Sequence, residues 1–145
     1  MNKRGFTLIE LLIVIVILGI LSMAILSAIN PLEQIRKATD SGKRADSAEL
    51  LNALERYYTT FQKYPWTTAP NGTLVAGATW LAELVSKAEV KVEFTTHKNL
   101  ASLYATQDAQ SLVHVCFVPE SASFKALANK DVKGGTGTTH ICIPE

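Results

Sequence analysis

The first residues that could do chemistry are Gly5-Phe6-Thr7-Leu8-Ile9-Glu10, where a carboxylate stands just inside a long apolar segment. The basic residues Lys3 and Arg4 precede this run, and apolar side chains then dominate as far as Ile29. An ionisable group inside a membrane helix costs roughly 2.5 kcal/mol or more at the bilayer centre, so it calls for a partner. We therefore expect Glu10 to need a positive charge close by.

A cut after Gly5 would supply that charge, because it leaves a new α-amino group on Phe6. That amine cannot readily reach Glu10 of its own chain, which lies about 6 Å further along the helix. The amine of one copy and Glu10 of an adjacent copy could pair if the copies are staggered along one axis, and the pair would fix their register. The alternative is that Glu10 belongs to a plain single-span anchor and reaches toward the lipid headgroups.

The apolar segment, residues 6–29, is long enough to cross a membrane. As a helix it would rise about 36 Å, against a hydrocarbon core of roughly 30 Å. A secretory signal peptide has a shorter apolar region, about 7–15 residues, with its cleavage site after it. In this chain the cleavable junction, between Gly5 and Phe6, lies before the apolar segment instead of after it. Asn30 and Pro31 mark the exit from the membrane, where proline can begin a new helical segment or kink a continuous one.

Residues 32–61 predict an amphipathic helix, because apolar side chains recur at three- and four-residue spacing. Ser41-Gly42 is the predicted weak point of that helix. Asp40, Lys43 and Asp46 are interpreted only as charges that flank the membrane span, and charge counting does not settle its orientation.

The rest of the chain predicts a small sheet. Residues 79–88 predict a short helix, 124–130 a weaker one, and 67–72 a loop. Segments rich in β-branched and aromatic residues predict strands at 90–96, 102–106, 112–118 and 140–143, with His97 at a strand surface. The predicted fold class is α+β, with one long N-terminal helix and a small antiparallel sheet packed on its C-terminal half.

Composition argues against several functions. The chain has 145 residues, a net charge of +1 and no Lys/Arg cluster, so nucleic-acid binding is not favoured. No nucleophile–base–acid set is evident, and the glycine-rich run 134–137 lacks the Lys-Ser/Thr and the helix of a phosphate loop. We therefore expect no enzyme, no cofactor and no metal.

Cys116 and Cys142 are the two cysteines, and an even count in an exported domain suggests one disulfide. The alternative is a zinc site, because His114 and His140 each stand two residues before a cysteine and share its strand face. His-x-Cys is not a common structural zinc spacing, so the disulfide is favoured. Val113, Val115 and Phe117 would then lie on the opposite face and pack on the long helix. The other arrangement has the disulfide facing inward.

The run Gly5-Phe6-Thr7-Leu8-Ile9-Glu10-Leu11-Leu12 resembles the class III signal of type IV pilins and type II secretion pseudopilins. The helix end, Tyr57-Tyr58 to Tyr64-Pro65, also resembles that of the family. The resemblance implies a type IV pilin-like fold. It assigns residues 1–5 to a prepilin leader peptide, 6–29 to the transmembrane and assembly half of the helix, and 30–145 to an extracytoplasmic globular domain.

The same resemblance implies roles for single residues. A prepilin peptidase would cleave between Gly5 and Phe6 and N-methylate Phe6, and Glu10 would be needed for methylation and assembly. Gly19 falls where helices of the family often loosen in the filament. A proline frequent in the family would fall at Ser27, whereas the nearest proline here is Pro31.

The implied partners are further copies of the chain in a helical filament, the prepilin peptidase/methylase, an inner-membrane assembly platform and, before assembly, the lipid bilayer. The chain would be single-pass in the cytoplasmic membrane first and part of a cell-surface filament afterwards. In the family, Cys116 and Cys142 correspond to a disulfide loop that holds the last strand.

The favoured function is a structural subunit of a type IV pilus. The alternative is a pseudopilin of a type II secretion or competence system. Clustered acidic Ca²⁺ ligands near the C-terminus would favour the main secretion pseudopilin, but only Asp108, Glu120 and Asp131 are found, scattered. Two other hypotheses are an anchored receptor that never polymerises and a DNA-uptake protein. Asn71 begins a glycosylation triplet of a kind common by chance.

Overall fold

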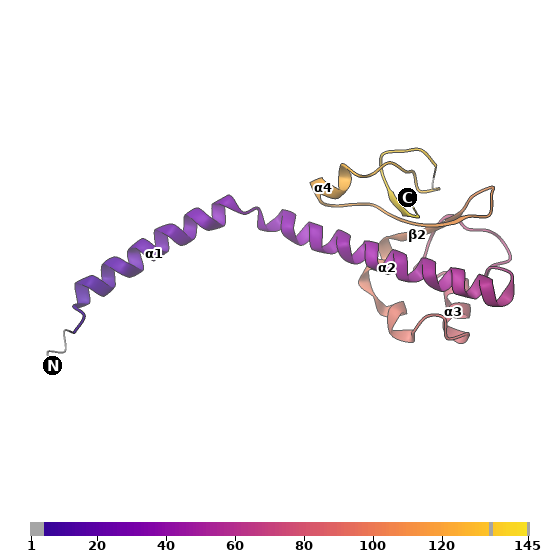
Figure 1. Cartoon of the computed structure of the whole chain (residues 1–145), viewed down its shortest axis with the longest axis horizontal. Coiled ribbons are helices and arrows are strands. Elements are labelled where there is room, and N and C mark those ends of the chain that lie inside the picture. Colours follow the sequence, from indigo (N-terminus) through magenta and orange to yellow (C-terminus); the bar gives the residue numbers. More distant parts are fainter. Residues whose placement is uncertain (1–4, 134, 145) are drawn as a thin grey trace. The chain divides into compact units, whose positions relative to one another are not determined.

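The computed structural model describes residues 5–133 and 135–144. The chain forms two compact units, of which the first ends at Gln34 and the second begins at Ile35. The first unit holds the helix α1 (Leu8–Ala28) and the start of α2 (Pro31–Phe61). The second unit holds the remainder of α2, the sheet and the short helices (Figure 1). The predicted α+β class is confirmed.

The apolar helix and the amphipathic helix are separate elements. Ile29 has an extended backbone, with φ −102° and ψ 123°, and ends α1. Asn30 then caps α2, because its Oδ1 accepts a hydrogen bond from the Glu33 N–H at 3.2 Å. Pro31 suits the first helical position, where no N–H is needed. Proline therefore begins a new segment here, and α2 runs through Ser41-Gly42 without the predicted interruption.

The sheet is antiparallel with the order β1-β2-β3-β4. Its strands are β1 (Asn71–Leu74), β2 (Leu103–Gln107), β3 (Val113–Phe117) and β4 (Ile141–Ile143). Between β1 and β2 the chain forms the α-helix α3 (Thr79–Ser86) and two 3₁₀ helices, η1 (Val92–Thr96) and η2 (Lys98–Ser102). The short helix α4 (Ala122–Lys125) lies between β3 and β4.

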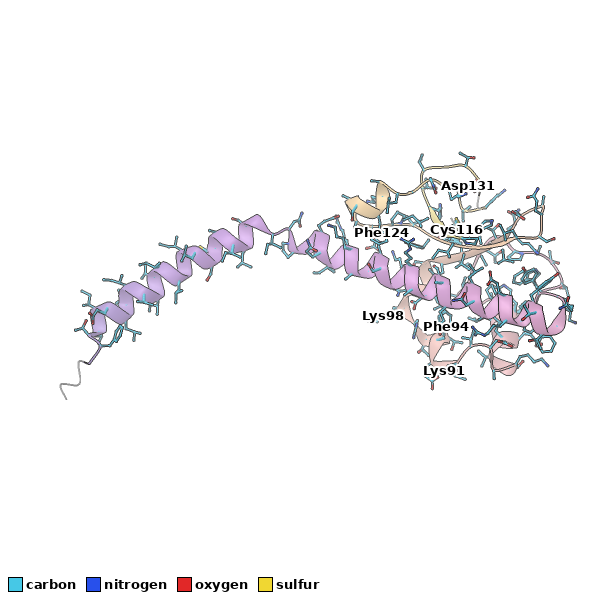
Figure 2. The ribbon with its side chains drawn as sticks, in the orientation of Figure 1. Lys91, Phe94, Lys98, Cys116, Phe124 and Asp131 are labelled. Carbon is cyan, nitrogen blue, oxygen red and sulfur yellow. A yellow bond between two sulfur atoms is a disulfide. The ribbon has the colours of Figure 1, made fainter. Side chains whose placement is uncertain are left out.

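The core of the second unit lies between α2 and these elements. Leu50 and Leu54 of α2 are fully buried in one cluster with Phe94 of η1 and Val115 of β3. In the view of Figure 2, α2 runs between Phe94 and Cys116, with the sheet on one side and the 3₁₀ turns on the other. Val113, Val115 and Phe117 belong to this core, as their alternation in the sequence predicted.

Three local predictions are corrected by the structure. The strand predicted at 90–96 is not formed, and Val92–Thr96 is the 3₁₀ helix η1, in which Phe94 is buried whereas Val92 is 63 % exposed. Asn71 and Gly72, expected to end the loop 67–72, belong to the edge strand β1, whose pairing is offset by a bulge at Gly72 with φ +69°. The weak helix predicted at 124–130 is instead the short helix Ala122–Lys125, so most of the predicted range is not helical.

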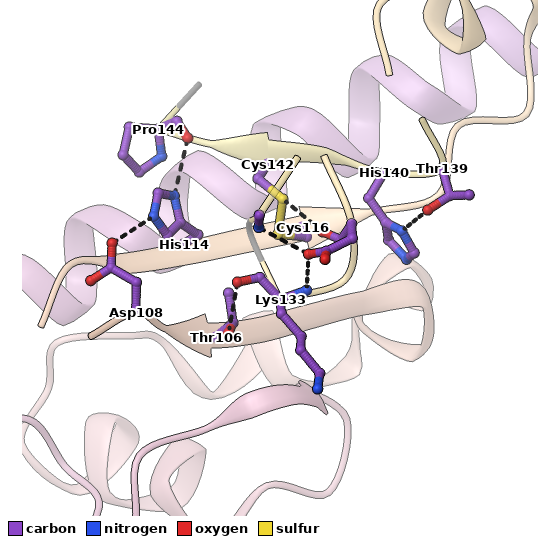
Figure 3. The surroundings of a disulfide bond; sticks show 11 residues. Thr106, Asp108, His114, Cys116, Lys133, Thr139, His140, Cys142 and Pro144 are labelled. Atoms are coloured by element: carbon purple, nitrogen blue, oxygen red, sulfur yellow. Dashed lines mark hydrogen bonds and ion pairs between the residues drawn. A yellow bond between two sulfur atoms is a disulfide. The ribbon is translucent and has the colours of Figure 1, made fainter. Parts of the chain in front are cut away.

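Cys116 and Cys142 form the disulfide that the sequence favoured. They are directly opposite residues of β3 and β4, with Cα atoms 3.9 Å apart, which is the closer spacing of antiparallel pairs. The loop between these strands returns over the outer face of the sheet, where the Lys133 carbonyl accepts a hydrogen bond from Thr106 Oγ1 at 3.3 Å (Figure 3). This cover explains why all five residues of β3 are buried.

The glycine-rich end of that loop is closely packed. A Cβ at Gly137 would lie 2.7 Å from the backbone nitrogen of Asp131, closer than such atoms approach. The Gly137 N–H also donates to the Asn129 carbonyl at 3.1 Å. The glycine is therefore needed for a close approach of two backbone segments, beyond the flexible turn that the sequence suggested.

We expect removal of the disulfide to destabilise the second unit. The double substitution Cys116→Ala/Cys142→Ala should lower the free energy of unfolding by about 3 kcal/mol, because the unfolded chain regains the freedom of the closed loop. Urea unfolding of the full-length chain in detergent micelles measures this. A reductant should destabilise the unsubstituted chain by a similar amount and leave the variant unchanged; an effect of reductant on the variant would contradict this account.

Candidate assembly site

Thr7 and Glu10 form a capping box at the start of α1. Thr7 is the N-cap residue, and its Oγ1 accepts a hydrogen bond from the Glu10 N–H at 3.3 Å. In return, Glu10 Oε2 accepts bonds from the backbone N–H and the hydroxyl of Thr7, each at 2.8 Å. The helix consequently begins at Leu8, two residues after the start of the predicted helical segment, and Phe6 lies outside it.

The capping box shows that, within one copy, the Glu10 carboxylate is bound by Thr7 of the same chain. A positive charge was expected beside Glu10, whereas within one copy two neutral donors on Thr7 contact its carboxylate. The signal was present, because Thr7-Leu8-Ile9-Glu10 has the Ser/Thr-x-x-Glu spacing of a capping box. Both bonds go to Oε2, and Oε1 has no hydrogen-bond partner among the described residues. Half of the acceptor capacity of Glu10 is thus unused within the chain.

The surface of α1 is apolar on every side. All described side chains from Gly5 to Ser27 are exposed, including Leu8 at 82 % and Met23 at 77 %. Within the described residues one helical stretch, Leu8–Ser27 with a mean hydropathy of 3.0, is long and apolar enough to cross a membrane by length and composition. A helix that is hydrophobic all round is stable when lipid or other protein surrounds it.

The backbone of α1 is regular through the positions singled out by resemblance. Gly19 lies inside the helix, and a Cβ there would meet no atom within 4 Å. Ser27, where the family often has proline, donates its hydroxyl proton to the Ala24 carbonyl at 2.9 Å. In the described chain neither position interrupts the helix.

A buried polar cluster on α2, which the sequence analysis missed, holds the segment after β3. Asp40 is fully buried, and its carboxylate accepts hydrogen bonds from the Glu120 N–H at 2.9 Å and the Ser121 N–H at 2.8 Å. The hydroxyl of Ser121 donates to the same carboxylate at 2.7 Å and accepts from the Phe124 N–H as the cap of α4. Asp40 therefore fixes where α4 begins.

Lys43 adds a charge pair to this cluster. Its ammonium group lies 2.6 Å from the carboxylate of Glu120 and 3.9 Å from that of Asp40. It also donates to the Val118 carbonyl at 3.3 Å. The Lys43 side chain is almost fully buried, so its charge is compensated by these acceptors instead of by water.

One turn further along α2, Asp46 holds the 3₁₀ segment. Asn99 Nδ2 donates to the Asp46 carboxylate at 2.7 Å, and His97 Nδ1 lies 3.2 Å from it. His97 thus lies between η1 and η2, not at the strand surface that was predicted. Asp40, Lys43 and Asp46 continue toward the N-terminus the buried stripe of α2 that contains Leu50 and Leu54. The three-residue spacing of Asp40, Lys43 and Asp46 was the signal in the sequence that these side chains are buried.

The alternative zinc site is not formed. The disulfide engages both sulfur atoms, and His114 instead lies 3.2 Å from the Pro144 carbonyl and 3.6 Å from the carboxylate of Asp108 (Figure 3). His140 contacts the hydroxyl of Thr139 at 2.8 Å. Among the residues that the structure describes, no group of three or more His, Cys, Asp or Glu side chains could hold a metal ion.

The comparison with protein families identifies the N-terminal segment. Residues 1–26 match the prokaryotic N-terminal methylation motif, which is the class III signal typical of type IV pilins and pseudopilins. Proteins of that family are structural and not enzymes, and the motif implies processing by a prepilin peptidase and assembly into a filament. No curated protein and no solved structure gives a significant match.

We expect Asp40→Ala to lower the free energy of unfolding by about 2–4 kcal/mol, because it leaves the backbone N–H groups of Glu120 and Ser121 and the Ser121 hydroxyl without their buried acceptor. Glu49→Ala is the matched control on the exposed side of α2 and should change stability by less than about 0.5 kcal/mol. Urea unfolding of both variants measures the difference. Equal stabilities would show that the Asp40 cluster does not hold the segment.

We expect the pKa of His140 to lie below its ordinary value of 6.5, because partial burial disfavours the imidazolium form and the Asp131 carboxylate offsets only part of that effect. The unfolded chain then binds more protons than the folded one as the pH falls below 6.5. Stability should therefore decrease with acidification, less steeply in His140→Gln. Titration of the His140 ring protons by NMR measures the pKa, and a value at or above 6.5 would contradict the prediction.

Proposed function

We propose that this chain is the structural subunit of a type IV pilus-like extracellular filament. It is made as a prepilin whose leader, residues 1–5, is removed between Gly5 and Phe6, and Phe6 is then N-methylated. The match of residues 1–26 to the N-terminal methylation motif supports this processing. Before assembly α1 holds the subunit in the cytoplasmic membrane, and residues 30–145 form the extracytoplasmic domain.

The observation that carries the proposal is the exposure of α1 on all sides. Its apolar side chains need a non-aqueous environment, first the bilayer and later the α1 helices of neighbouring copies. Exchange of lipid for protein contacts keeps that surface out of water throughout. A filament core built from such helices needs no further apolar element from the second unit.

Glu10 of one copy and the α-amino group of Phe6 in the next set the axial register between neighbouring copies in the filament. Cleavage removes Gly5 but leaves Thr7, so the capping box and its two hydrogen bonds to Oε2 survive in the mature chain. Oε1 remains open to the α-amino group of Phe6 in an adjacent copy. The pair forms only at one axial offset between copies, and a charged pair surrounded by apolar side chains penalises every other offset.

The partners follow from this route. The prepilin peptidase acts as both protease and methylase, an inner-membrane assembly platform extracts the subunit from the bilayer, and further copies complete the filament. The Cys116–Cys142 disulfide suits an oxidising compartment outside the cytoplasm.

A pseudopilin of a secretion or competence system uses the same N-terminal segment. The disulfide loop, in place of a Ca²⁺ site near the C-terminus, favours the pilus.

The test separates the charge of Glu10 from its capping role. Glu10→Gln keeps a capping box, since glutamine is accepted at that position, but it cannot pair with an amine as an anion. We expect this variant to be membrane-inserted in cells that make the prepilin peptidase, with sheared surface filaments reduced at least tenfold by electron microscopy. Mass spectrometry of the filaments should find a mature N-terminus at N-methylated Phe6.

Thr7→Ala is the complementary variant, because it removes the capping hydroxyl and keeps the carboxylate. It should assemble far better than Glu10→Gln. Glu49→Gln, on the exposed side of α2, controls for loss of a carboxylate elsewhere. Normal filaments from Glu10→Gln would refute pairing through Glu10, and an uncut N-terminus in the filaments would refute the proposed processing.

A further inference from the structure

An aromatic cleft of about 600 Å³ opens at the C-terminal end of α2. The end of α2, the segment that follows it and α3 form its walls, and Figure 1 shows α3 beside this end of α2. Its volume lies within the range of sites that hold small molecules. Its aromatic wall consists of Tyr64, Trp66 and Trp80, and its polar groups are those of Thr67, Thr68, Thr79, Glu83 and Lys63.

The wall of the cleft is built from rings that hold one another in place. Tyr64 and Trp66 stack with ring centroids 4.8 Å apart and planes 8° apart, and Trp80 meets Trp66 edge-on at 5.6 Å. Tyr58 packs on the other side of this row, 4.7 Å from Tyr64. The indole N–H of Trp66 donates to Gln107 Oε1 at 3.0 Å, which ties the row to β2. The wall is therefore preformed, and a ligand would not have to order it.

Polar groups with spare hydrogen-bonding capacity line the same cleft. Thr67, Thr68 and Thr79 are exposed, and within the described chain their hydroxyls make no hydrogen bonds. Glu83 is half-buried, and among the described residues its carboxylate accepts from the Tyr57 hydroxyl alone, at 3.3 Å, so it can accept from a ligand as well. Lys63 adds an ammonium donor at the exposed rim.

We propose that this cleft binds a neutral saccharide. A pyranose ring presents apolar C–H groups on its faces and hydroxyls around its edge, and the cleft offers aromatic rings next to hydroxyl, carboxylate and ammonium groups. A purely apolar ligand would leave Glu83 and the threonines without partners. A cationic ligand would meet Lys63, and the rings stack on each other instead of surrounding a point, as a cage for a cation requires.

The proposal goes beyond a structural role, because it gives the subunit a ligand. It does not depend on filament assembly, since every lining residue belongs to one copy of the second unit. A subunit that binds saccharides would let a filament built from it contact glycans at each repeat, and weak single sites would add through multivalency.

The chain contains two tryptophans, Trp66 and Trp80, and both line the cleft, so its intrinsic emission reports on this site alone. The full-length protein, in a detergent without a sugar headgroup, is titrated with chitotriose, maltotriose and N-acetyllactosamine. We expect at least one of the three to cause a saturable change in emission. Tetramethylammonium, titrated in the same way, should cause none.

Two conservative variants test the polar groups, since each removes one of them without removing bulk. Glu83→Gln and Thr68→Val should each weaken binding about two- to tenfold, the loss expected for one hydrogen bond. Glu89→Gln and Thr73→Val are matched controls outside the cleft and should bind as the unsubstituted chain does.

Three results would overturn the proposal. The first is no response to any of the three saccharides, and the second is a response that Glu83→Gln and Thr68→Val leave unchanged. The third is saturable binding of tetramethylammonium in place of the saccharides, which would assign the cleft to cations. If the two cleft variants abolish filaments while the unsubstituted chain binds no saccharide, the cleft is a contact between subunits and the proposal is wrong.

Discussion

The structure depends on one constraint, which is that every described side chain of α1 from Leu8 to Ser27 is exposed. Its polar groups are almost all satisfied locally, because Ser22 and Ser27 donate to carbonyls of the preceding turn. Glu10 is the single charged residue of α1, and one of its oxygens is without a hydrogen-bond partner in the described chain. A surface of this kind is stable in lipid or among copies of itself, and Glu10 is the group that can distinguish one neighbouring position from another.

The capping box sets where that group lies. Thr7 draws the carboxylate back toward the start of the helix, where the N–H groups of the first turn favour negative charge. The carboxylate is thus held close to the point at which the proposed cleavage between Gly5 and Phe6 would create an amine. The neutral contact and the charged contact do not compete for the same oxygen, so capping of one copy and pairing with the next are compatible.

Local sequence patterns predicted those helices and strands whose own residue types and spacing determine their secondary structure. The apolar run could be predicted from its length, α2 from the period of its apolar side chains, and the segments of β2, β3 and β4 from their β-branched and aromatic residues. The strand predicted at 90–96 failed because Val90, Val92 and Phe94 alternate in sequence, while only Val90 and Phe94 are buried. The roles of Asp40 and Asp46 depend on partners more than fifty residues away, which no local pattern encodes, whereas the Thr7–Glu10 spacing was a local signal that was overlooked.

The two helices differ in burial, since α1 is exposed and α2 is partly buried from Asp40 onward. Among the residues whose burial is described, Asp40 is the first buried one, and Leu32 and Ile35 on the first turns of α2 remain exposed. From Asp40 onward α2 is covered by its own chain, first through the polar contacts at Asp40 and Lys43 and then through leucines. Polar contacts at this boundary are directional, so they fix the covering segments in one position, which apolar contacts alone would not do. The chain thus keeps its own core separate from the apolar surface that it leaves for lipid or for other copies.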